Sequence, residues 1–123
     1  MAPKSILVVD DDPHVGNTLS LLLMIDRHQV EVVRHGEMAL ARYKPGKYDL
    51  VITDLLMPGI DGLELAQLIK ARNPQQPVVL ISGHLDGVPD SDKTLLKNFD
   101  VMLAKPFSQQ QLREGLSAVF PDG

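Results

Sequence analysis

The chain has 123 residues, a length typical of one globular domain, and 44% of them are hydrophobic, enough to form a core without disulfide bonds. It contains no cysteine, which excludes disulfides and thiolate metal sites and is consistent with a cytoplasmic protein. Twelve basic and sixteen acidic residues give a net charge of −4. No overall positive field would attract nucleic acid or an anionic membrane, so we expect neither direct nucleic-acid binding nor membrane insertion.

The first half of the chain alternates short apolar runs with amphipathic stretches. Residues 6–9 predict a buried strand, and Asp12 followed by Pro13 predicts a helix start, with an N-cap and a proline at the first helical position. Helical spacing predicts a core-facing stripe that consists of Val15, Leu19, Leu22 and Leu23. A second strand is predicted at 29–33 and a second helix at 36–44, where a proline–glycine pair ends it.

The same alternation continues through the second half. A third strand is predicted at 48–53, and Asp61 is expected to cap a helix whose buried stripe is Leu65, Leu68 and Ile69. A very apolar fourth strand at 77–81 precedes a weak, short helix at 91–98, and a fifth strand follows at 99–104. The last predicted helix has a regular apolar face made by Leu112, Leu116, Val119 and Phe120.

This regular alternation predicts an α/β fold with a parallel sheet covered by helices on both faces. In such sheets, ligands bind beyond the carboxyl ends of the strands, so the residues at those ends matter most for function. Chemically informative side chains follow four of the five predicted strands, namely Asp10 with Asp11, then Asp54, Ser82 and Lys105.

Three carboxylates meet at one point if the first and third strands are neighbours: those of Asp10, Asp11 and Asp54. Like charges this close raise one another's pKa and cost stability unless a cation neutralises them. Oxygen ligands suit Mg²⁺, which commonly recruits phosphate oxygens as further ligands. The hydroxyl of Ser82 and the ammonium group of Lys105 suit a bound phosphoryl group, and an aspartate carboxylate can itself attack phosphorus.

With these residues in view, nearly the whole chain resembles the receiver domain of two-component response regulators. The resemblance is carried by VVDD at 8–11, TD at 53–54 with MPGIDG at 57–62, ISG at 81–83, and KPF at 105–107. Each motif alone is weak, but their order and spacing together are specific. The resemblance implies a flavodoxin-like, doubly wound (βα)5 three-layer sandwich with the strand order 2-1-3-4-5.

The resemblance also implies the roles of the acidic residues. Asp54 would be the phosphoacceptor. Asp11 and Asp54 would bind Mg²⁺, or Mn²⁺ in its place, together with the backbone carbonyl of Leu56. Asp10 would act on the same ion through a metal-bound water, whereas Asp12 is interpreted as a helix cap only.

The remaining site residues lie in the second half of the chain. The resemblance implies that Ser82 binds a phosphoryl oxygen, that Lys105 pairs with the phosphate, and that Pro106 follows a cis peptide bond. His84 is expected at the rim of the site. Met102 occupies the switch position, where the family usually has Tyr or Phe, so the structural read-out of phosphorylation is expected to differ from that of aromatic relatives.

The implied function is a phosphorylation-dependent signalling switch. A histidine kinase or phosphotransfer protein would supply the phosphoryl group, and an unidentified effector or output domain would respond. The receiver would catalyse its own phosphorylation and dephosphorylation, so it is interpreted as a switch and not as an enzyme. Residues 1–123 are expected to form a single receiver domain with no output domain in this chain, which leaves open a stand-alone regulator, a phosphorelay shuttle or part of a longer protein.

Two alternatives come from other functional classes. A Mg²⁺-dependent phosphohydrolase could use the Asp-x-Asp at 10–12, but such enzymes need a cap over the substrate, for which this chain has no room. A pseudo-receiver would keep the fold without being phosphorylated, and the intact set of acidic, hydroxyl and lysine residues argues against it. Catalytic turnover of a phosphoester would favour the first alternative, and no phosphorylation at all would favour the second.

Overall fold

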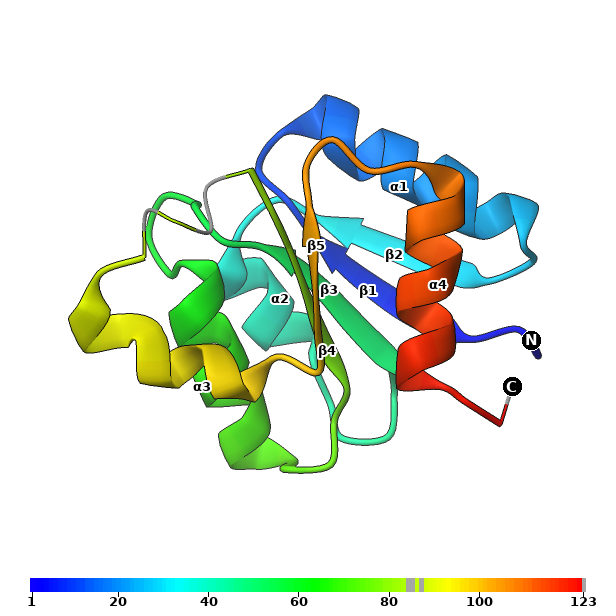
Figure 1. The fold of residues 1–123 in the computed structure, drawn as a ribbon. Helices are drawn as coiled ribbons and strands as arrows, with labels where there is room; N and C mark the ends of the chain where they lie inside the picture. The colour runs from blue at the N-terminus through cyan, green and yellow to red at the C-terminus, as the bar shows by residue number, and fades with distance from the viewer. Residues whose placement is uncertain (84–85, 87, 123) are drawn as a thin grey trace.

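The structure, a computed structural model, describes residues 1–83, 86 and 88–122. Five parallel strands form one sheet in the order β2-β1-β3-β4-β5, which confirms the predicted flavodoxin-like topology (Figure 1). The strands are β1 Ser5–Val9, β2 Gln29–Val33, β3 Leu50–Asp54, β4 Val78–Ser82 and β5 Val101–Ala104. The helices are α1 Pro13–Ile25, α2 Gly36–Arg42, α3 Gly62–Arg72, the 3₁₀ helix η2 Asp90–Asn98 and α4 Gln109–Val119.

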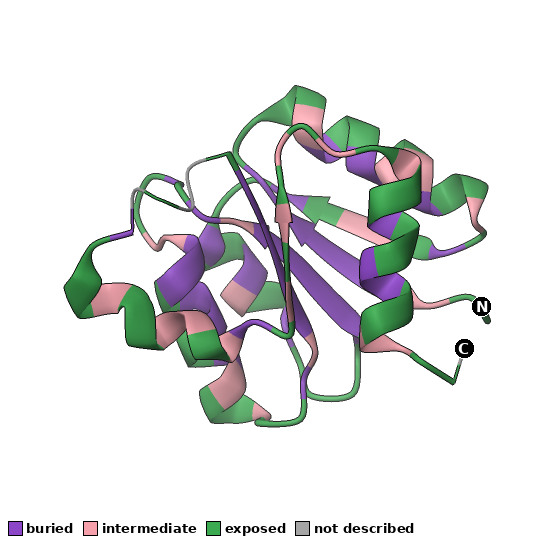
Figure 2. Ribbon diagram, in the orientation of Figure 1, coloured by how far each residue is buried: buried purple, intermediate pink, exposed green. Residues whose placement is uncertain are grey.

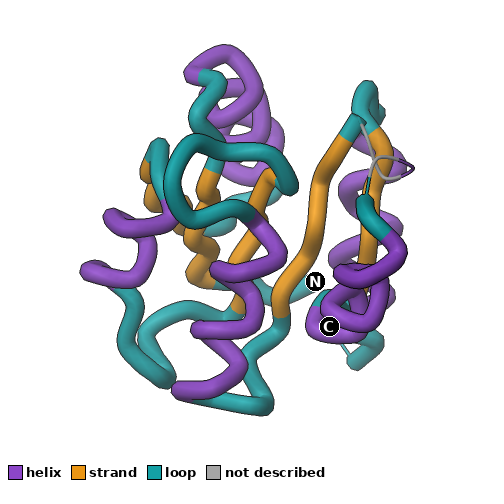
Figure 3. The backbone as a smooth tube through the Cα atoms, turned by 90° about the vertical axis from the view of Figure 1, so that its left-hand side faces the viewer, coloured by secondary structure: helices purple, strands orange, loops and turns teal. Residues whose placement is uncertain are grey.

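Helices cover both faces of the sheet and produce two separate cores. Helices α1 and α4 lie on one face, and α2, α3 and η2 lie on the other (Figure 1). Successive residues of a strand point to opposite faces, so Ile6 packs in the core under α1 and α4 while Leu7 packs in the core under α2 and α3. The central strands β1, β3 and β4 are buried except at Ser5 and Asp54, which are partly exposed (Figure 2). Figure 3 shows the strands surrounded by helices and loops.

The predicted helix starts are confirmed at two aspartates. The Asp12 carboxylate accepts the N–H of His14 at 2.9 Å at the start of α1, and Asp61 accepts the N–H of Glu64 at 2.9 Å at the start of α3. Each cap satisfies a backbone donor that has no partner within its own helix. Because both caps are short acidic side chains at a strand-to-helix turn, they also fix where each helix leaves the carboxyl edge of the sheet.

Two of the predicted strands begin two residues later than expected. Strand β3 begins at Leu50 instead of residue 48, because Asp49 uses its carboxylate to accept the N–H of Ser5 at 2.8 Å. Strand β5 begins at Val101 instead of residue 99, because the N–H of Phe99 closes the preceding 3₁₀ helix. In both cases the apolar pattern begins before the strand does, at Tyr48 and at Phe99, which are buried in the core.

Two details of the helices also differ from prediction. Helix α2 ends at Arg42 instead of residue 44, and Tyr43 is already extended at φ −68° and ψ 133°. Lys44 directly precedes Pro45, a position where the helical conformation is disfavoured, so the helix does not reach residue 44. Leu68 was predicted in the buried stripe of α3 but is 38% exposed. Helix α3 therefore packs on the sheet through a narrower face than the spacing of its leucines indicates.

The predicted short helix at 91–98 is present as η2, Asp90–Asn98, but it is a 3₁₀ helix and not an α-helix. None of its residues is buried, and it packs against the core under α3 through the partly buried Leu95 and Leu96. Its first residue follows Pro89, which provides no capping side chain. The tighter 3₁₀ form is usual for short helices that lack both a cap and a broad apolar face.

No helix in the described part of the chain has the length and apolar character that are required to cross a bilayer.

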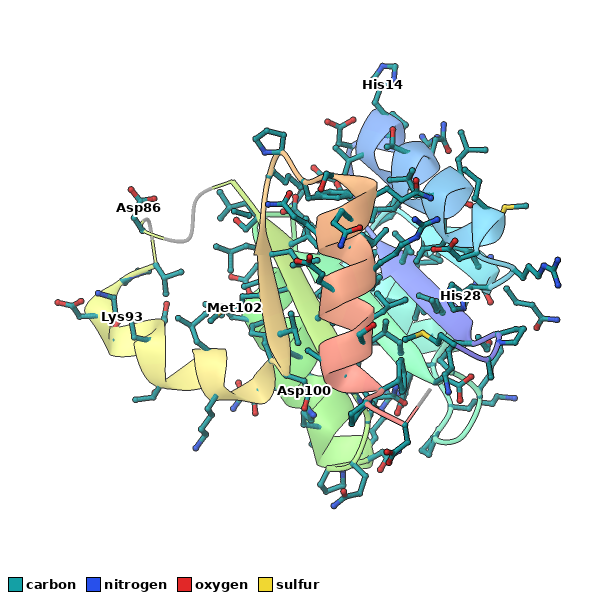
Figure 4. All side chains as sticks on the ribbon, turned by 45° about the vertical axis from the view of Figure 1, so that its right-hand side comes forward. His14, His28, Asp86, Lys93, Asp100 and Met102 are labelled. Atoms are coloured by element: carbon teal, nitrogen blue, oxygen red, sulfur yellow. The ribbon has the colours of Figure 1, made fainter. Side chains whose placement is uncertain are left out.

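The buried His28 couples the stability of the fold to pH. The His28 side chain is 6% exposed and its Nδ1 accepts the N–H of Lys4 at 2.9 Å (Figure 4), a bond that only the neutral imidazole can accept. Burial lowers the pKa of His28, although the nearby charge of Asp26 opposes this shift. The folded state therefore binds a proton less readily than the unfolded state does.

We expect the free energy of unfolding to fall as the pH decreases below the unfolded pKa of about 6.5, with a slope of up to about 1.4 kcal/mol per pH unit, and to level off below the lowered folded pKa. Substituting His28→Asn, which keeps an acceptor but cannot be protonated, should flatten this dependence. Urea denaturation between pH 5 and 7.5 measures it, and His14→Asn at the exposed start of α1 is the matched control. Equal slopes in wild type and His28→Asn would contradict the prediction.

Candidate functional site

Three acidic side chains converge at the carboxyl edge of the sheet. Strands β1 and β3 are neighbours, with Val9 opposite Thr53, so Asp10 and Asp54 come next to each other where the two strands end. One oxygen from each of Asp10, Asp11 and Asp54 lies within 4.8 Å of the others. The convergence expected from the sequence is therefore present, and it follows directly from the strand order.

Asp10 is the most deeply buried member of this group, with 2% of its surface exposed. Its Oδ1 accepts the N–H of Asp12 at 2.9 Å, and its Oδ2 lies 3.2 Å from Nζ of Lys105. Burial raises the pKa of Asp10, and the charge of Asp54 raises it further against the opposing effects of these two contacts. The side chain is therefore held in an environment that disfavours its charged form.

Lys105 links the two carboxylates from the other side of the pocket. Its Nζ lies 3.2 Å from Oδ2 of Asp10 and 3.3 Å from Oδ1 of Asp54. The backbone N–H of Lys105 donates to the carbonyl of Ser82 at 3.0 Å, and the peptide bond between Lys105 and Pro106 is cis. Burial alone would lower the pKa of Lys105, but the two carboxylates outweigh it and the pKa is raised. The ammonium group is thus held charged at this point.

The turn after Asp54 is held by two hydrogen bonds, each of which has a backbone N–H as its donor. Oδ1 of Asp54 accepts the N–H of Leu55 at 2.8 Å, and the N–H of Gly62 donates to the carbonyl of Leu55 at 2.8 Å. A Cβ atom at Gly62 would collide with the carbonyl oxygen of Asp54, so only glycine fits there. The sequence predicted Asp61 only as the cap of the next helix, and did not indicate this close contact between Gly62 and the end of β3.

The other predicted site residues occupy different positions around the pocket. Ser82 is 2% exposed at the carboxyl end of β4, beside the end of β3. Leu56 follows the Asp54 turn with its side chain 58% exposed. Met102 lies on β5, 47% exposed and away from the carboxyl edge (Figure 4). His84, expected at the rim, lies outside the described residues.

The pocket as a whole carries uncompensated negative charge. Three carboxylates face one ammonium group, which leaves two negative charges to be balanced. Oxygen ligands at this spacing fit a hard divalent cation such as Mg²⁺, and they offer no nitrogen or sulfur ligand that would favour zinc. The residues present therefore fit a magnesium site next to a lysine and a buried hydroxyl.

Comparison with known proteins agrees with this chemistry. The model of the response regulator receiver domain family matches residues 6–117. The chain is 33% identical over 114 residues to the transcriptional regulatory protein TcrA of Mycobacterium tuberculosis, covering 93% of this chain and 45% of that protein. It is 31% identical over 117 residues to the response regulator MprA of Mycolicibacterium vanbaalenii, covering 95% of this chain and 50% of that protein. It thus spans about half the length of the curated relatives that it matches.

The fold is also shared with solved structures. The response regulator protein TrrA from Thermotoga maritima, crystallised in complex with Mg²⁺-BeF, superimposes with a TM-score of 0.84 at 32% identity, covering 94% of this chain and 98% of that chain. The chain belongs to the response regulator receiver domain family.

Proposed function

We propose that this receiver takes a phosphoryl group from the phosphohistidine of a partner histidine kinase or phosphotransfer protein onto Asp54. The observation that supports this most directly is the position of Lys105, whose Nζ lies within 3.3 Å of carboxylate oxygens from both Asp10 and Asp54. A cation held between two acids at a strand end is suited to a phosphoryl group that arrives on one of them.

The residues of the pocket divide the work of the transfer. A carboxylate oxygen of Asp54 attacks phosphorus, the new O–P bond forms, the P–N bond breaks, and the imidazole of the donor leaves with the electron pair. The N–H of Leu55, 2.8 Å from Oδ1, orients the attacking carboxylate. Lys105 then exchanges a contact with Asp54 for one with a phosphoryl oxygen, and the buried hydroxyl of Ser82 donates to another.

Mg²⁺ fits the acidic part of the same pocket. Asp11, Asp54 and the backbone carbonyl of Leu56 would hold it, and Asp10 would act through a metal-bound water. When bound, the ion supplies positive charge that stabilises the transferring phosphoryl group. The complex of TrrA with Mg²⁺-BeF supports this assignment, because that relative shares the fold and 32% of its sequence with this chain.

Phosphorylation is expected to act through the edge of the sheet formed by β4 and β5. The added negative charge would draw Ser82 and Lys105 toward the phosphoryl group. Both residues lie where β4 and β5 end, so their movement would change the surface that β5 presents. Met102 stands on β5 where the family resemblance implies an aromatic residue, so an exposed flexible thioether side chain would report the change in place of a ring.

Wild-type protein incubated with a small phosphodonor such as acetyl phosphate is expected to gain one phosphoryl group, seen as about 80 Da by intact-mass analysis, since one carboxylate is the acceptor. Chelating Mg²⁺ should reduce the rate at least about tenfold, because the carboxylates then repel the donor. Uptake that is independent of Mg²⁺, or continuous turnover of the donor without a labelled protein, would contradict the proposal and favour a phosphohydrolase.

A further inference from the structure

The seven-residue loop between β3 and α3, residues 55–61, carries the backbone carbonyl proposed as a metal ligand. Its two ends are fixed, because the N–H of Gly62 bonds to the carbonyl of Leu55. Within the loop, Met57 is buried and anchors one point, while Leu56 and Pro58 on either side of it are exposed. The second half of the loop therefore needs a separate contact to fix its path.

That contact comes from Glu37 in the first turn of α2. Its Oε1 accepts the N–H of Ile60 at 2.8 Å across 23 residues of sequence. Gly59 has φ +75°, and a Cβ atom there would collide with the same carboxylate oxygen. Among the described residues, this is the only hydrogen bond that a side chain outside the loop makes to the backbone of residues 56–61.

The carboxylate is suited to this task for two reasons. The hydrogen bond from the N–H of Ile60 is the main cause that lowers the pKa of Glu37, and a hydrogen bond from the N–H of Glu37 itself is the second. The side chain therefore remains an ionised acceptor at neutral pH. Glu37 also lies in the first turn of α2, where the helix dipole favours a negative charge. The loop is thus attached to α2, a helix from which no residue belongs to the acidic cluster or pairs with Lys105 in the part of the chain that the structure describes.

The geometry points to Glu37 as a positioning residue for the reaction at Asp54: by holding Ile60 it fixes the loop that presents the carbonyl of Leu56, and so sets the affinity for Mg²⁺. This inference rests on the proposed function. Glu37 does not touch the carboxylates or Lys105 in the described structure, so it acts through the loop and not on the reacting atoms. A role of this kind should change the binding of the ion and leave the transfer step intact.

Glu37→Ala is expected to raise the dissociation constant for Mg²⁺ about 3- to 10-fold, below the about 10- to 100-fold effects of residues that bond directly to a metal ligand, because the Glu37 bond is solvent-exposed and acts through the loop. The phosphorylation rate at saturating Mg²⁺ should stay within about twofold of wild type. Amide exchange of Ile60 in the metal-free protein should become at least about tenfold faster. Glu37→Gln keeps an oxygen acceptor and should restore the Mg²⁺ affinity to within about twofold.

Calorimetric titration with Mg²⁺, hydrogen exchange by NMR and the acetyl phosphate assay provide the three readouts. Glu64→Ala is the matched control, since it also removes a carboxylate from the first turn of a helix, here α3. The Glu64 carboxylate makes no ion pair or hydrogen bond with the described residues. Unchanged Mg²⁺ affinity, or unchanged exchange of Ile60, in a folded Glu37→Ala protein would overturn the role of Glu37 alone. Failure of wild type to bind Mg²⁺ would overturn the proposed function as well, so the two failures are distinguishable.

Discussion

Asp54→Asn is expected to abolish phosphoryl uptake from both acetyl phosphate and a phosphorylated kinase. The amide of Asn is not a nucleophile toward phosphorus, whereas its oxygen can still accept the N–H of Leu55 that orients the native carboxylate. The substitution therefore removes the chemistry while preserving the turn. Lys105 also keeps its contact with Asp10 at 3.2 Å, so the fold should be unaffected.

Asp61→Asn is the matched control for this variant. It makes the same exchange of one oxygen for nitrogen, with the same change of charge, at the other end of the same loop. Asn caps helices as well as Asp does, so α3 should remain capped at the N–H of Glu64. Intact-mass analysis should show one added phosphoryl group in Asp61→Asn and none in Asp54→Asn. A label on another residue of Asp54→Asn would show that the acceptor has been misassigned.

The central part of the site could be predicted because strand ends are easy to locate in this sequence. The apolar runs before Asp10 and Asp54 mark buried parallel strands, and parallel strands place their carboxyl ends at one edge. The positions of these two residues and of Lys105 then follow from the strand order, which the family resemblance supplied. This part of the prediction required only the positions of the strand ends, and no information on side-chain contacts.

The parts that could not be predicted depend on contacts between segments far apart in the sequence. Nothing near Glu37 indicates that its carboxylate reaches Ile60, because the partner is fixed by how α2 and the β3–α3 loop lie in space. Leu68 has helical spacing suited to burial, yet the packing of α3 leaves it exposed. The 3₁₀ form of η2 likewise reflects how little apolar surface it buries, a tertiary property that local propensity does not report.

Asp10→Asn is expected to stabilise the metal-free protein by about 1–2 kcal/mol while weakening Mg²⁺ binding about 10- to 100-fold. In wild type, a carboxylate that is 2% exposed faces the charge of Asp54, and the single contact with Lys105 only partly offsets this cost. Asn removes the buried charge and can still accept the N–H of Asp12. Lys105 is not left alone, because Asp54 remains 3.3 Å from its Nζ.

Mg²⁺ should therefore stabilise wild type more than it stabilises the Asp10→Asn variant. At a Mg²⁺ concentration 100 times its dissociation constant, binding adds about 2.7 kcal/mol to the stability of wild type, but about 1.4 kcal/mol or less to a variant that binds at least tenfold more weakly. Urea denaturation with and without Mg²⁺ measures both effects, and Asp12→Asn, which alters an exposed cap, should show neither. A less stable metal-free Asp10→Asn would mean that the pairing of Asp10 with Lys105 outweighs the burial of the charge. The acidic pocket would then contribute to folding as well as to the binding of the ion.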